Sequence, residues 1–218
     1  MRKVIILGNG GHSLGIQEAL LNLGYTEDEL GIVDPEEGTS PLGIRRIGGD
    51  EDLPRLRSEG WETAVIGVGS VTGTRLRRRL AQKLKDVGIA LMPLADPAAR
   101  ISRSARMGEG AYAAKGALIQ PACEIGEMAI INTGAVVEHS CTVGAFSHVS
   151  SGAVLLGDVS VGEDTLIGGG SVVRQGIRIG SRCVIGAGSV VVQDIPDGKI
   201  AYGNPCRIRG ETNDTDYR

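Results

Sequence analysis

The stretch AVVEHSCTVGAFSHVSSGAVLLGDVSVG, residues 135–162, carries an aliphatic residue at every sixth position. The same register runs in both directions without an insertion, and all of its positions are apolar: Ile101, Met107, Ala113, Ile119, Ile125, Ile131, Val137, Val143, Val149, Leu155, Val161, Ile167, Val173, Ile179, Ile185 and Val191. Neither a helix, with a period of 3.6, nor a half-buried strand, with a period of two, accounts for this spacing. A hexapeptide repeat does, because three short strands form one coil and each side points one residue inward. The sequence therefore predicts a parallel β-helix of roughly five coils, about 25 Å long.

Two further positions keep this register. A small residue mostly stands four places after each inward position, where a tight corner is expected, and three of the four cysteines occupy it: Cys123, Cys141 and Cys183. We interpret these cysteines as small buried residues, and the lack of a C-x-x-C motif disfavours a cysteine zinc site. Glycine marks one corner of every coil, at intervals of eighteen residues: Gly108, Gly126, Gly144, Gly162 and Gly180. We expect a positive φ or a close backbone approach at these glycines.

Residues 1–90 follow a different pattern, in which short apolar strands alternate with helices. Strands are predicted at 4–7, 32–33 and 64–68, and helices at 13–23 and 74–87. This alternation is typical of a parallel sheet with helices on its faces. We expect a small α/β (Rossmann-like) domain at 1–90, a linker at 91–100, the β-helix at 101–209 and a polar tail at 210–218.

The predicted helix at 74–87 carries a run of basic residues. Its apolar face is expected to consist of Leu76, Leu80, Leu84 and Val87. We interpret the basic run as the solvated face of the helix rather than as a phosphate site: Arg75, Arg77, Arg78, Arg79, Lys83 and Lys85.

The composition disfavours several classes of function. The 218 residues carry a net charge of −3 and only six aromatic side chains, one Trp, one Phe and four Tyr. Nucleic-acid binding requires basic patches or stacking platforms, which this composition does not support. No apolar run is long enough to span a membrane, and the N-terminal residues predict a strand and a loop rather than a signal peptide. We therefore expect a cytoplasmic protein that binds neither nucleic acid nor membranes.

A glycine-rich turn at 8–12, Gly-Asn-Gly-Gly-His, joins the first strand to the first helix. Free backbone N–H groups and a helix N-terminus meet there, and together they attract phosphate. Asp34 ends the next strand, where a ribose or base contact is expected. Ser13 replaces the third glycine of the dinucleotide fingerprint, so NAD binding is not predicted. A nucleotide-linked ligand and a tight turn without a ligand both stay open, and His12 could contact a ligand or cap the helix.

Two of the three histidines, His139 and His148, lie inside the repeat, nine residues or half a coil apart. His139 follows the inward Val137 by two residues, so we expect it near a corner and pointing outward. Because the interior of a β-helix is packed, an active site must lie on its outside, most naturally between packed copies. An imidazole there is a candidate general base at neutral pH. The alternative, that both histidines are ordinary surface or interface residues, is equally supported.

Metal chemistry is a weaker alternative. The β-helical carbonic anhydrases hold zinc with three histidines from neighbouring chains, whereas only two histidines lie within this repeat. We predict no metal cofactor.

Five segments together resemble a known family: the turn at 8–12, Ile32-Val33-Asp34, the segments 131–139 and 146–150, and Gly203-Asn204-Pro205. They are similar to those of the bacterial sugar acyltransferases of the left-handed β-helix class. The nearest groups are the UDP-4-amino-sugar N-acetyltransferases and the sialic acid O-acetyltransferases. The resemblance covers nearly the whole chain. It implies a left-handed coil, a homotrimer with sites between adjacent β-helices, and acetyl-CoA as co-substrate.

The resemblance also implies roles for individual residues. His139 matches the general base and the backbone N–H of Gly157 matches the oxyanion donor. Positions implied to contact the cofactor are His148, Gly157, Gly169 and Ala187. Positions implied to contact the nucleotide-linked sugar are Gly10, Gly11, His12, Asp34, Gly69 and Asn132. The expected reaction is a direct attack of the sugar amine on the thioester of acetyl-CoA.

Two positions depart from the family pattern. Ser140 stands where the N-acetyltransferases have an acidic residue after the catalytic histidine, so it can orient the imidazole but supplies no charge. Pro35 replaces a second acid after Asp34. The sequence predicts N-acetylation of a UDP- or dTDP-linked 4-amino-4,6-dideoxy sugar. A sugar O-acetyltransferase of the sialic acid type and a non-catalytic ligand-binding β-helix remain as alternatives.

Overall fold

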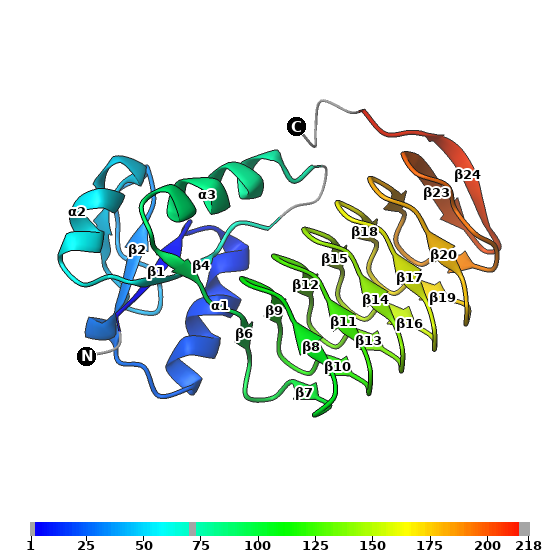
Figure 1. The fold of residues 1–218 in the computed structure, drawn as a ribbon, viewed down its shortest axis with the longest axis horizontal. Helices are drawn as coiled ribbons and strands as arrows, with labels where there is room; N and C mark the ends of the chain where they lie inside the picture. Colours follow the sequence, from blue (N-terminus) through cyan, green and yellow to red (C-terminus); the bar gives the residue numbers. More distant parts are fainter. Residues whose placement is uncertain (1–2, 70–72, 214–218) are drawn as a thin grey trace.

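The N-terminal domain is a parallel sheet covered on both faces by helices (Figure 1). The fold is a computed structural model that describes residues 3–69 and 73–213. The strand order is β3-β2-β1-β4-β5, with β1 at Val4–Leu7, β2 at Leu30–Val33, β3 at Arg46–Gly48, β4 at Thr63–Ile66 and β5 at Ala90–Leu91. The α-helices are α1 at Gly11–Asn22, α2 at Leu53–Ser58 and α3 at Arg75–Asp86, and short 3₁₀ helices cover Glu27–Glu29 and Asp50–Asp52.

The alternation of side chains along β1 explains why helices cover both faces. Ile5 and Leu7 pack with Leu53 of α2 and Leu80 of α3. Val4 and Ile6 pack on the other side of the sheet, together with Ile16 and Leu20 of α1. A strand buried on both faces needs apolar side chains at every position, as in Val4–Leu7, which matches a parallel sheet. The predicted α/β domain is confirmed.

The C-terminal half is a parallel β-helix with three faces, each built from strands that lie eighteen residues apart, except at the C-terminal end of one face. We call the first the apolar face; it contains β7 (Arg100–Ile101), β10 (Leu118–Ile119), β13 (Val136–Val137), β16 (Val154–Leu155), β19 (Val172–Val173) and β22 (Val190–Val191). The polar face contains β8 (Arg106–Met107), β11 (Glu124–Ile125), β14 (Thr142–Val143), β17 (Ser160–Val161) and β20 (Arg178–Ile179).

The third face packs against the N-terminal domain at its first strands, and we call it the docking face. Its strands are β6 (Leu94–Ala95), β9 (Tyr112–Ala113), β12 (Ile130–Ile131), β15 (His148–Val149), β18 (Leu166–Ile167), β21 (Val184–Ile185), β23 (Lys199–Gly203) and β24 (Cys206–Glu211). β6 to β22 are seventeen strands, or between five and six coils of three. The roughly five coils predicted from the repeat are therefore confirmed.

The six-residue register is also the register of strand pairing. On the apolar face Ile101 pairs with Ile119, Ile119 with Val137 and Val137 with Leu155. These inward side chains stack along the axis, and Ile119, Val137 and Leu155 are at most 1 % exposed. Cys123, Cys141 and Cys183 are fully buried at the small corner position, as predicted. Burial of each large aliphatic side chain contributes about 1.5–3 kcal/mol relative to an exposed one.

We expected the once-per-coil glycines to provide either a positive φ or a close backbone approach. In the structure, different corner residues meet these two requirements. A residue with positive φ recurs every six residues from Gly110 to Gly188, and seven of these are not glycine, among them Met128, Ser140 and Phe146. The once-per-coil glycines have ordinary φ values. A Cβ on Gly108 would instead lie 2.6 Å from the backbone nitrogen of Glu127 in the next coil. Close approach between coils, and not positive φ, explains these glycines.

Both ends of the β-helix differ from the predicted boundaries. The segment 91–100, expected to be a linker, contains β6, which pairs with β9 and forms the first side of the coil. Ala95 continues the six-residue register one step before Ile101, so the repeat begins earlier than its prolines suggested. At the other end, β24 extends through Glu211 and pairs with β23, so the predicted tail begins inside a strand. Residues 214–218 of that tail lie outside the described residues.

Within the described residues, no helix combines the length and the apolar composition that a membrane span requires.

Candidate functional site

Two faces of the β-helix meet at each of three corners, and the candidate residues are distributed over these corners. His139 and Gly157 lie one coil apart on the corner between the apolar and polar faces, which we call the His139 corner. Gly169 and Ala187 lie one coil apart on the corner between the docking and apolar faces, the Gly169 corner. The corner between the polar and docking faces is named after Phe146. The predicted base and Gly157 therefore lie at one edge of the apolar face, and the predicted cofactor positions Gly169 and Ala187 lie at the opposite edge.

A pocket of about 340 Å³ lies between the N-terminal domain and the docking face. The domain contributes Gly11, His12 and Gly69, and the β-helix contributes Asn132 and His148, all of them residues predicted to contact substrate or cofactor. The pocket is completed by Gly15, Tyr112, Ala114 and Thr133. None of these lining residues carries a carboxylate. The structure thus brings five predicted site residues from two domains to one place.

The glycines of the turn fall into two kinds. Gly8 has a φ of +99° and a Cβ there would lie 2.8 Å from Val68, so the fold itself requires glycine. Gly10 and Gly11 have no positive φ, and a Cβ on either would meet nothing within 4 Å. The fold gives no reason for glycine at these two positions. Gly11 is the first residue of α1, and no side chain caps this helix N-terminus. Such a bare helix start suits a phosphate that approaches the backbone closely.

Asp34 shapes the turn and does not line the pocket. Its carboxylate accepts hydrogen bonds from the backbone N–H groups of Asn9, at 2.8 Å, and Glu36, at 2.9 Å. These bonds tie the end of β2 to the glycine turn.

His12 is an uncharged histidine on the N-terminal side of the pocket. Burial lowers its pKa to about 4, helped by the nearby His148 and Arg77. Its ring meets that of Tyr112 edge to face, with centroids 5.7 Å apart. A Cβ on Gly69 would lie 3.4 Å from the Cβ of His12, so the two residues are in van der Waals reach of each other. At neutral pH, His12 therefore presents a neutral ring to the pocket.

Asn132 fixes the tautomer of His148. The amide oxygen of Asn132 accepts the backbone N–H of Thr133 at 2.7 Å, which leaves the amide nitrogen to face Nε2 of His148 at 3.0 Å. Because an amide nitrogen can only donate, Nε2 must accept, and the proton of the neutral ring lies on Nδ1. His148 is 9 % exposed.

His139 has the opposite environment, exposed on its corner. Its Nδ1 lies 3.4 Å from the hydroxyl oxygen of Ser140, within reach of a long hydrogen bond. Its ring lies directly on Gly157, where a Cβ would come within 2.5 Å of Nε2. Within the described residues, the backbone N–H of Gly157 donates no hydrogen bond. An exposed base thus lies beside a free backbone donor.

The basic run on α3 is only partly the solvated face that the sequence predicted, because Arg75 and Arg79 are exposed but the basic residues between them are not. Arg77 is 2 % exposed, and Arg78 pairs with Asp164, with 2.6 Å between Nη2 and Oδ2. Leu76, assigned to the apolar face, is instead 45 % exposed. For these residues the prediction failed because it counted only the sheet as a partner of α3, whereas the helix also packs against the Phe146 corner.

Sequence reasoning missed Tyr112 and Thr133. Tyr112 is one of four tyrosines, and it stands at the outward position beside a small inward residue, Ala113. That pattern could have indicated a strand covered by another domain. Thr133 acts through its backbone N–H, which leaves no signal in the side-chain pattern. No group of three or more metal-ligating side chains lies within residues 3–69 and 73–213.

Comparison with known proteins gives matches to both domains. Residues 3–84 match the PglD N-terminal domain family, and residues 158–193 match the bacterial transferase hexapeptide family of six repeats. No curated protein matches the chain.

The similar solved structures include sugar-modifying enzymes. One is a histidine-to-alanine variant of GDP-perosamine N-acetyltransferase from Caulobacter crescentus, in complex with CoA and GDP-perosamine; it is 40 % identical, with a TM-score of 0.90 over 96 % of this chain and 97 % of that one. Another is the acetyltransferase domain of PglB from Neisseria gonorrhoeae in complex with acetyl coenzyme A, 35 % identical, with a TM-score of 0.89 over 95 % and 99 %. WeeI from Acinetobacter baumannii, at 16 % identity and a TM-score of 0.63 over 95 % and 99 %, shares the fold.

Proposed function

The chain belongs to the hexapeptide-repeat β-helix sugar acyltransferases, and we propose that it transfers the acetyl group of acetyl-CoA to the amine of a nucleotide-linked amino sugar. The observation that carries the proposal is the pocket between the domains. It gathers Gly11, His12 and Gly69 from a nucleotide-binding type of domain, and Asn132 and His148 from the β-helix. A non-catalytic ligand-binding β-helix would also need a pocket, and the similarity to acetyltransferases crystallised with CoA or acetyl-CoA favours transfer over binding alone.

We assign the nucleotide to the glycine turn. The bare N-terminus of α1 and the space above Gly10 and Gly11 suit the diphosphate. Asp34, at the end of β2, then lies beyond the turn on the side of the ribose and base. The sequence favoured UDP or dTDP, whereas the Caulobacter relative was crystallised with GDP-perosamine. We therefore propose a nucleoside diphosphate-linked 4-amino sugar and leave the choice of base to the assay below.

The proposed reaction needs no covalent enzyme intermediate. The amine nitrogen attacks the thioester carbon, His139 takes the proton that the nitrogen loses, the C–S bond breaks, and the thiolate of CoA is protonated on release. The N–H of Gly157 stabilises the tetrahedral oxyanion, a role that contributes about 3–4 kcal/mol in acyl transfer. Ser140 orients the imidazole of His139. His148, Gly169 and Ala187 hold the acetyl end and the chain of the cofactor.

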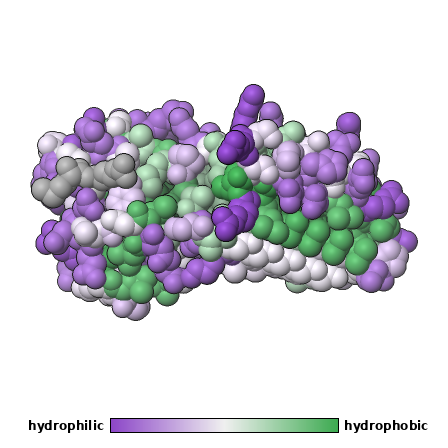
Figure 2. Space-filling view, turned by 90° about the horizontal axis from the view of Figure 1, so that it is seen from below, coloured by the Kyte–Doolittle hydropathy of each residue, from purple (hydrophilic) through white to green (hydrophobic). Residues whose placement is uncertain are grey.

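The positions of these residues support a homotrimer with shared sites. His139 lies at one edge of the apolar face, while the pocket and Gly169 lie at the other, so one chain cannot bring them together. The outward residues of the apolar face are partly exposed and aliphatic, forming the apolar band seen in Figure 2: Leu118, Val136, Val154, Val172 and Val190. Packing this face against a second copy buries the band. It also brings His139 of one chain to the Gly169 corner of the next.

The surroundings favour an amine over a hydroxyl acceptor. A hydroxyl needs a stronger base than an amine that is partly unprotonated at neutral pH, and Ser140 gives His139 no negative charge. The dependence on acetyl-CoA is consistent with a cytoplasmic enzyme. Its product, a nucleotide-linked acetamido sugar, is the kind of donor that glycan synthesis consumes.

The test is release of free CoA from acetyl-CoA with a panel of GDP-, UDP- and dTDP-linked 4-amino-6-deoxy sugars and the matching 4-hydroxy sugars. We expect turnover with at least one amine and none with its hydroxyl counterpart, and a product that is stable to mild alkali. Turnover only with hydroxyl acceptors would establish the O-acetyltransferase alternative, and no turnover with any acceptor contradicts the proposal.

A further inference from the structure

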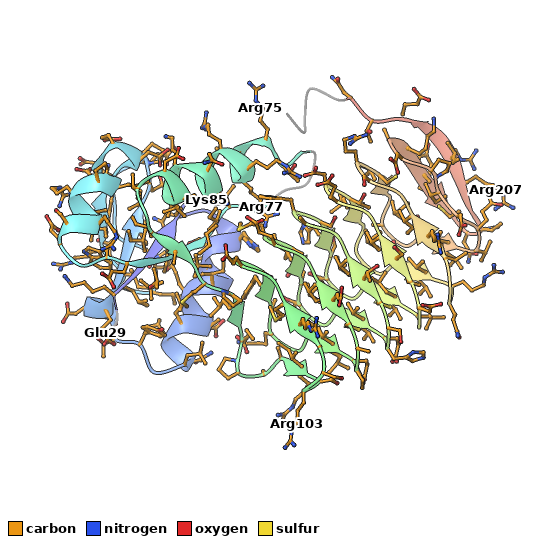
Figure 3. All side chains as sticks on the ribbon, in the orientation of Figure 1. Glu29, Arg75, Arg77, Lys85, Arg103 and Arg207 are labelled. Carbon is orange, nitrogen blue, oxygen red and sulfur yellow. The ribbon has the colours of Figure 1, made fainter. Side chains whose placement is uncertain are left out.

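Arg77 is a buried cation that the reaction proposed above does not use. It lies in the basic run of α3, where Arg75 and Arg79 are exposed, and Figure 3 shows Arg75 pointing away from the molecule while Arg77 lies on the side of the β-helix. Its guanidinium donates to the backbone oxygen of Phe146, at 3.2 Å, and to that of Met128. Burial lowers the pKa of Arg77 to about 10, which leaves it charged at neutral pH.

The two carbonyls that Arg77 binds belong to successive coils of the Phe146 corner. Met128 and Phe146 have φ values of 58° and 59°, a region that bulky residues rarely adopt. Both side chains are buried in the core of the N-terminal domain, at 1 % and 5 % exposure, beside Leu80 and Leu84 of α3. At this corner the β-helix thus carries large apolar side chains in a strained conformation, and these side chains dock α3.

A third successive coil completes the contact. Asp164 occupies the same corner position one coil further, and it accepts hydrogen bonds from the hydroxyl of Thr74, at 2.5 Å, and from Arg78. The ring of Phe146 also lies under the guanidinium of Arg78, 4.2 Å from its central carbon. The first turn of α3 therefore contacts three coils, which fixes both its position along the β-helix and its rotation.

The same corner leads directly into the pocket. Asn132 follows Met128 by four residues, and His148 follows Phe146 by two. On the other side, Gly69 precedes Thr74 by five residues. Arg77 also lies close enough to His12 to help depress the pKa of that histidine. The contacts of α3 therefore connect the N-terminal domain to the β-helix close in sequence to the residues that line the two sides of the pocket.

We propose that Arg77 is a positioning residue for acetyl transfer, holding His12 and Gly69 of the N-terminal domain in register with Asn132 and His148 of the β-helix. This inference rests on the proposed function. Each substrate is bound largely by one side of the pocket, so each affinity is local. Transfer requires both sides at the correct distance, and a misplacement of about 1 Å can reduce a rate about 100-fold. Arg77 thus contributes to the rate of transfer and not to the binding of either substrate alone.

The test separates binding from turnover in Arg77→Met and Arg77→Lys, with Arg75→Met as a matched control on the exposed side of α3. Titration calorimetry gives the affinity for acetyl-CoA and for the nucleotide sugar, each alone, and CoA release gives kcat. We expect both affinities within about twofold of wild type and a kcat about 100-fold lower in Arg77→Met. We expect partial recovery of kcat in Arg77→Lys, which keeps the positive charge but lacks the parallel N–H donors of the guanidinium. The control should match wild type.

Two results overturn the proposal: a wild-type kcat in folded Arg77→Met, or loss of affinity, kcat and thermal stability in parallel, which indicates a purely structural role. If Arg77→Met does not fold, the same two criteria apply to Arg77→Lys. Absence of turnover in the wild type is a different result, because it contradicts the proposed function itself.

Discussion

His139 and His148 are half a coil apart in the same repeat, yet they lie in opposite environments. His139 is exposed on a corner, with the hydroxyl oxygen of Ser140 3.4 Å from its Nδ1. His148 is buried against the N-terminal domain, and its tautomer is fixed by Asn132. The repeat determines where each ring lies, His139 at a corner and His148 on the docking face. The partner that covers that part of the β-helix determines what the ring can do. One partner, the N-terminal domain, belongs to the same chain; the other, on our proposal, is a second copy.

The largest effect is expected from a variant that prevents the apolar face from packing against a second copy of the chain. Val154→Glu places a charge in the middle of the apolar face, where burial of an unpaired carboxylate costs several kcal/mol. We expect monomers and no measurable turnover, although the pocket between the domains is intact and still binds the nucleotide sugar. Light scattering and CoA release measure these outcomes.

Ser160→Glu on the polar face is the control for that experiment, and it should leave both the oligomer and the rate unchanged. An active Val154→Glu monomer would show that one chain contains the whole site.

The next largest effect tests the two histidines directly. His139→Ala removes the proposed general base, and we expect kcat/KM to fall about 1,000-fold, within the range of general acid–base catalysis, with the affinity for both substrates retained. His148→Ala should instead weaken acetyl-CoA binding, because this residue is assigned to the cofactor. Initial rates and titration calorimetry separate these profiles, and an exchange of the two profiles between the variants contradicts the assignment.

The third histidine, His12, is tested through the pH dependence of the protein's stability. The pKa of His12 is lowered to about 4 in the fold, so between pH 6.5 and 4 the unfolded chain binds the proton that the folded chain does not. The contribution of this ring to stability is therefore complete above pH 6.5 and decreases as the pH falls towards 4, by up to about 3 kcal/mol. Thermal unfolding of wild type and His12→Gln across this window measures it.

His12→Gln has no ring to protonate, so its stability should depend less steeply on pH than that of the wild type. Equal slopes in the two proteins would mean that burial does not depress the pKa of His12.

The smallest effect concerns the nucleotide side of the pocket. Gly11→Val should weaken binding of the nucleotide sugar about 30-fold without loss of thermal stability, because the added side chain fills space that the fold leaves open and the diphosphate needs. Gly8→Ala should do the reverse, because its φ of +99° and the neighbouring Val68 oppose any side chain. Thermal shift and calorimetry distinguish the two, and destabilised Gly11→Val would show that this glycine is structural.

The difference between the regions also explains what the sequence could reveal. The β-helix was predicted closely because each inward residue, such as Val137 or Leu155, contacts its own repeat one coil away, and that periodicity is visible in one dimension. The start of the β-helix was not predicted, because its first inward residue, Ala95, is small and lies between two prolines. The environment of Arg77 could not be predicted, since its partners are backbone carbonyls of a distant corner and carry no sequence signal.

The sequence named candidate residues for the site but not their arrangement. The resemblance named Asn132 and His148 together with Gly11 and Gly69, and the structure places these four in one pocket. The separation of His139 from that pocket follows from the three-sided coil, which puts residues seven apart, such as Asn132 and His139, on different corners. On our proposal, a second chain brings them together.

The central claim is therefore that each site combines the pocket of one chain with His139 of another, and mixing two inactive variants tests it most directly. His139→Ala and Gly11→Asp, which places a carboxylate where the diphosphate binds, are each expected to be inactive as homotrimers. When the two are unfolded, mixed in equal amounts and refolded together, one site in four receives an intact pocket and an intact His139. The account predicts recovery of about one quarter of wild-type turnover, because random mixing in a closed ring makes each pairing equally frequent. Turnover that stays at the level of the separate variants would contradict it and place the whole site within one chain.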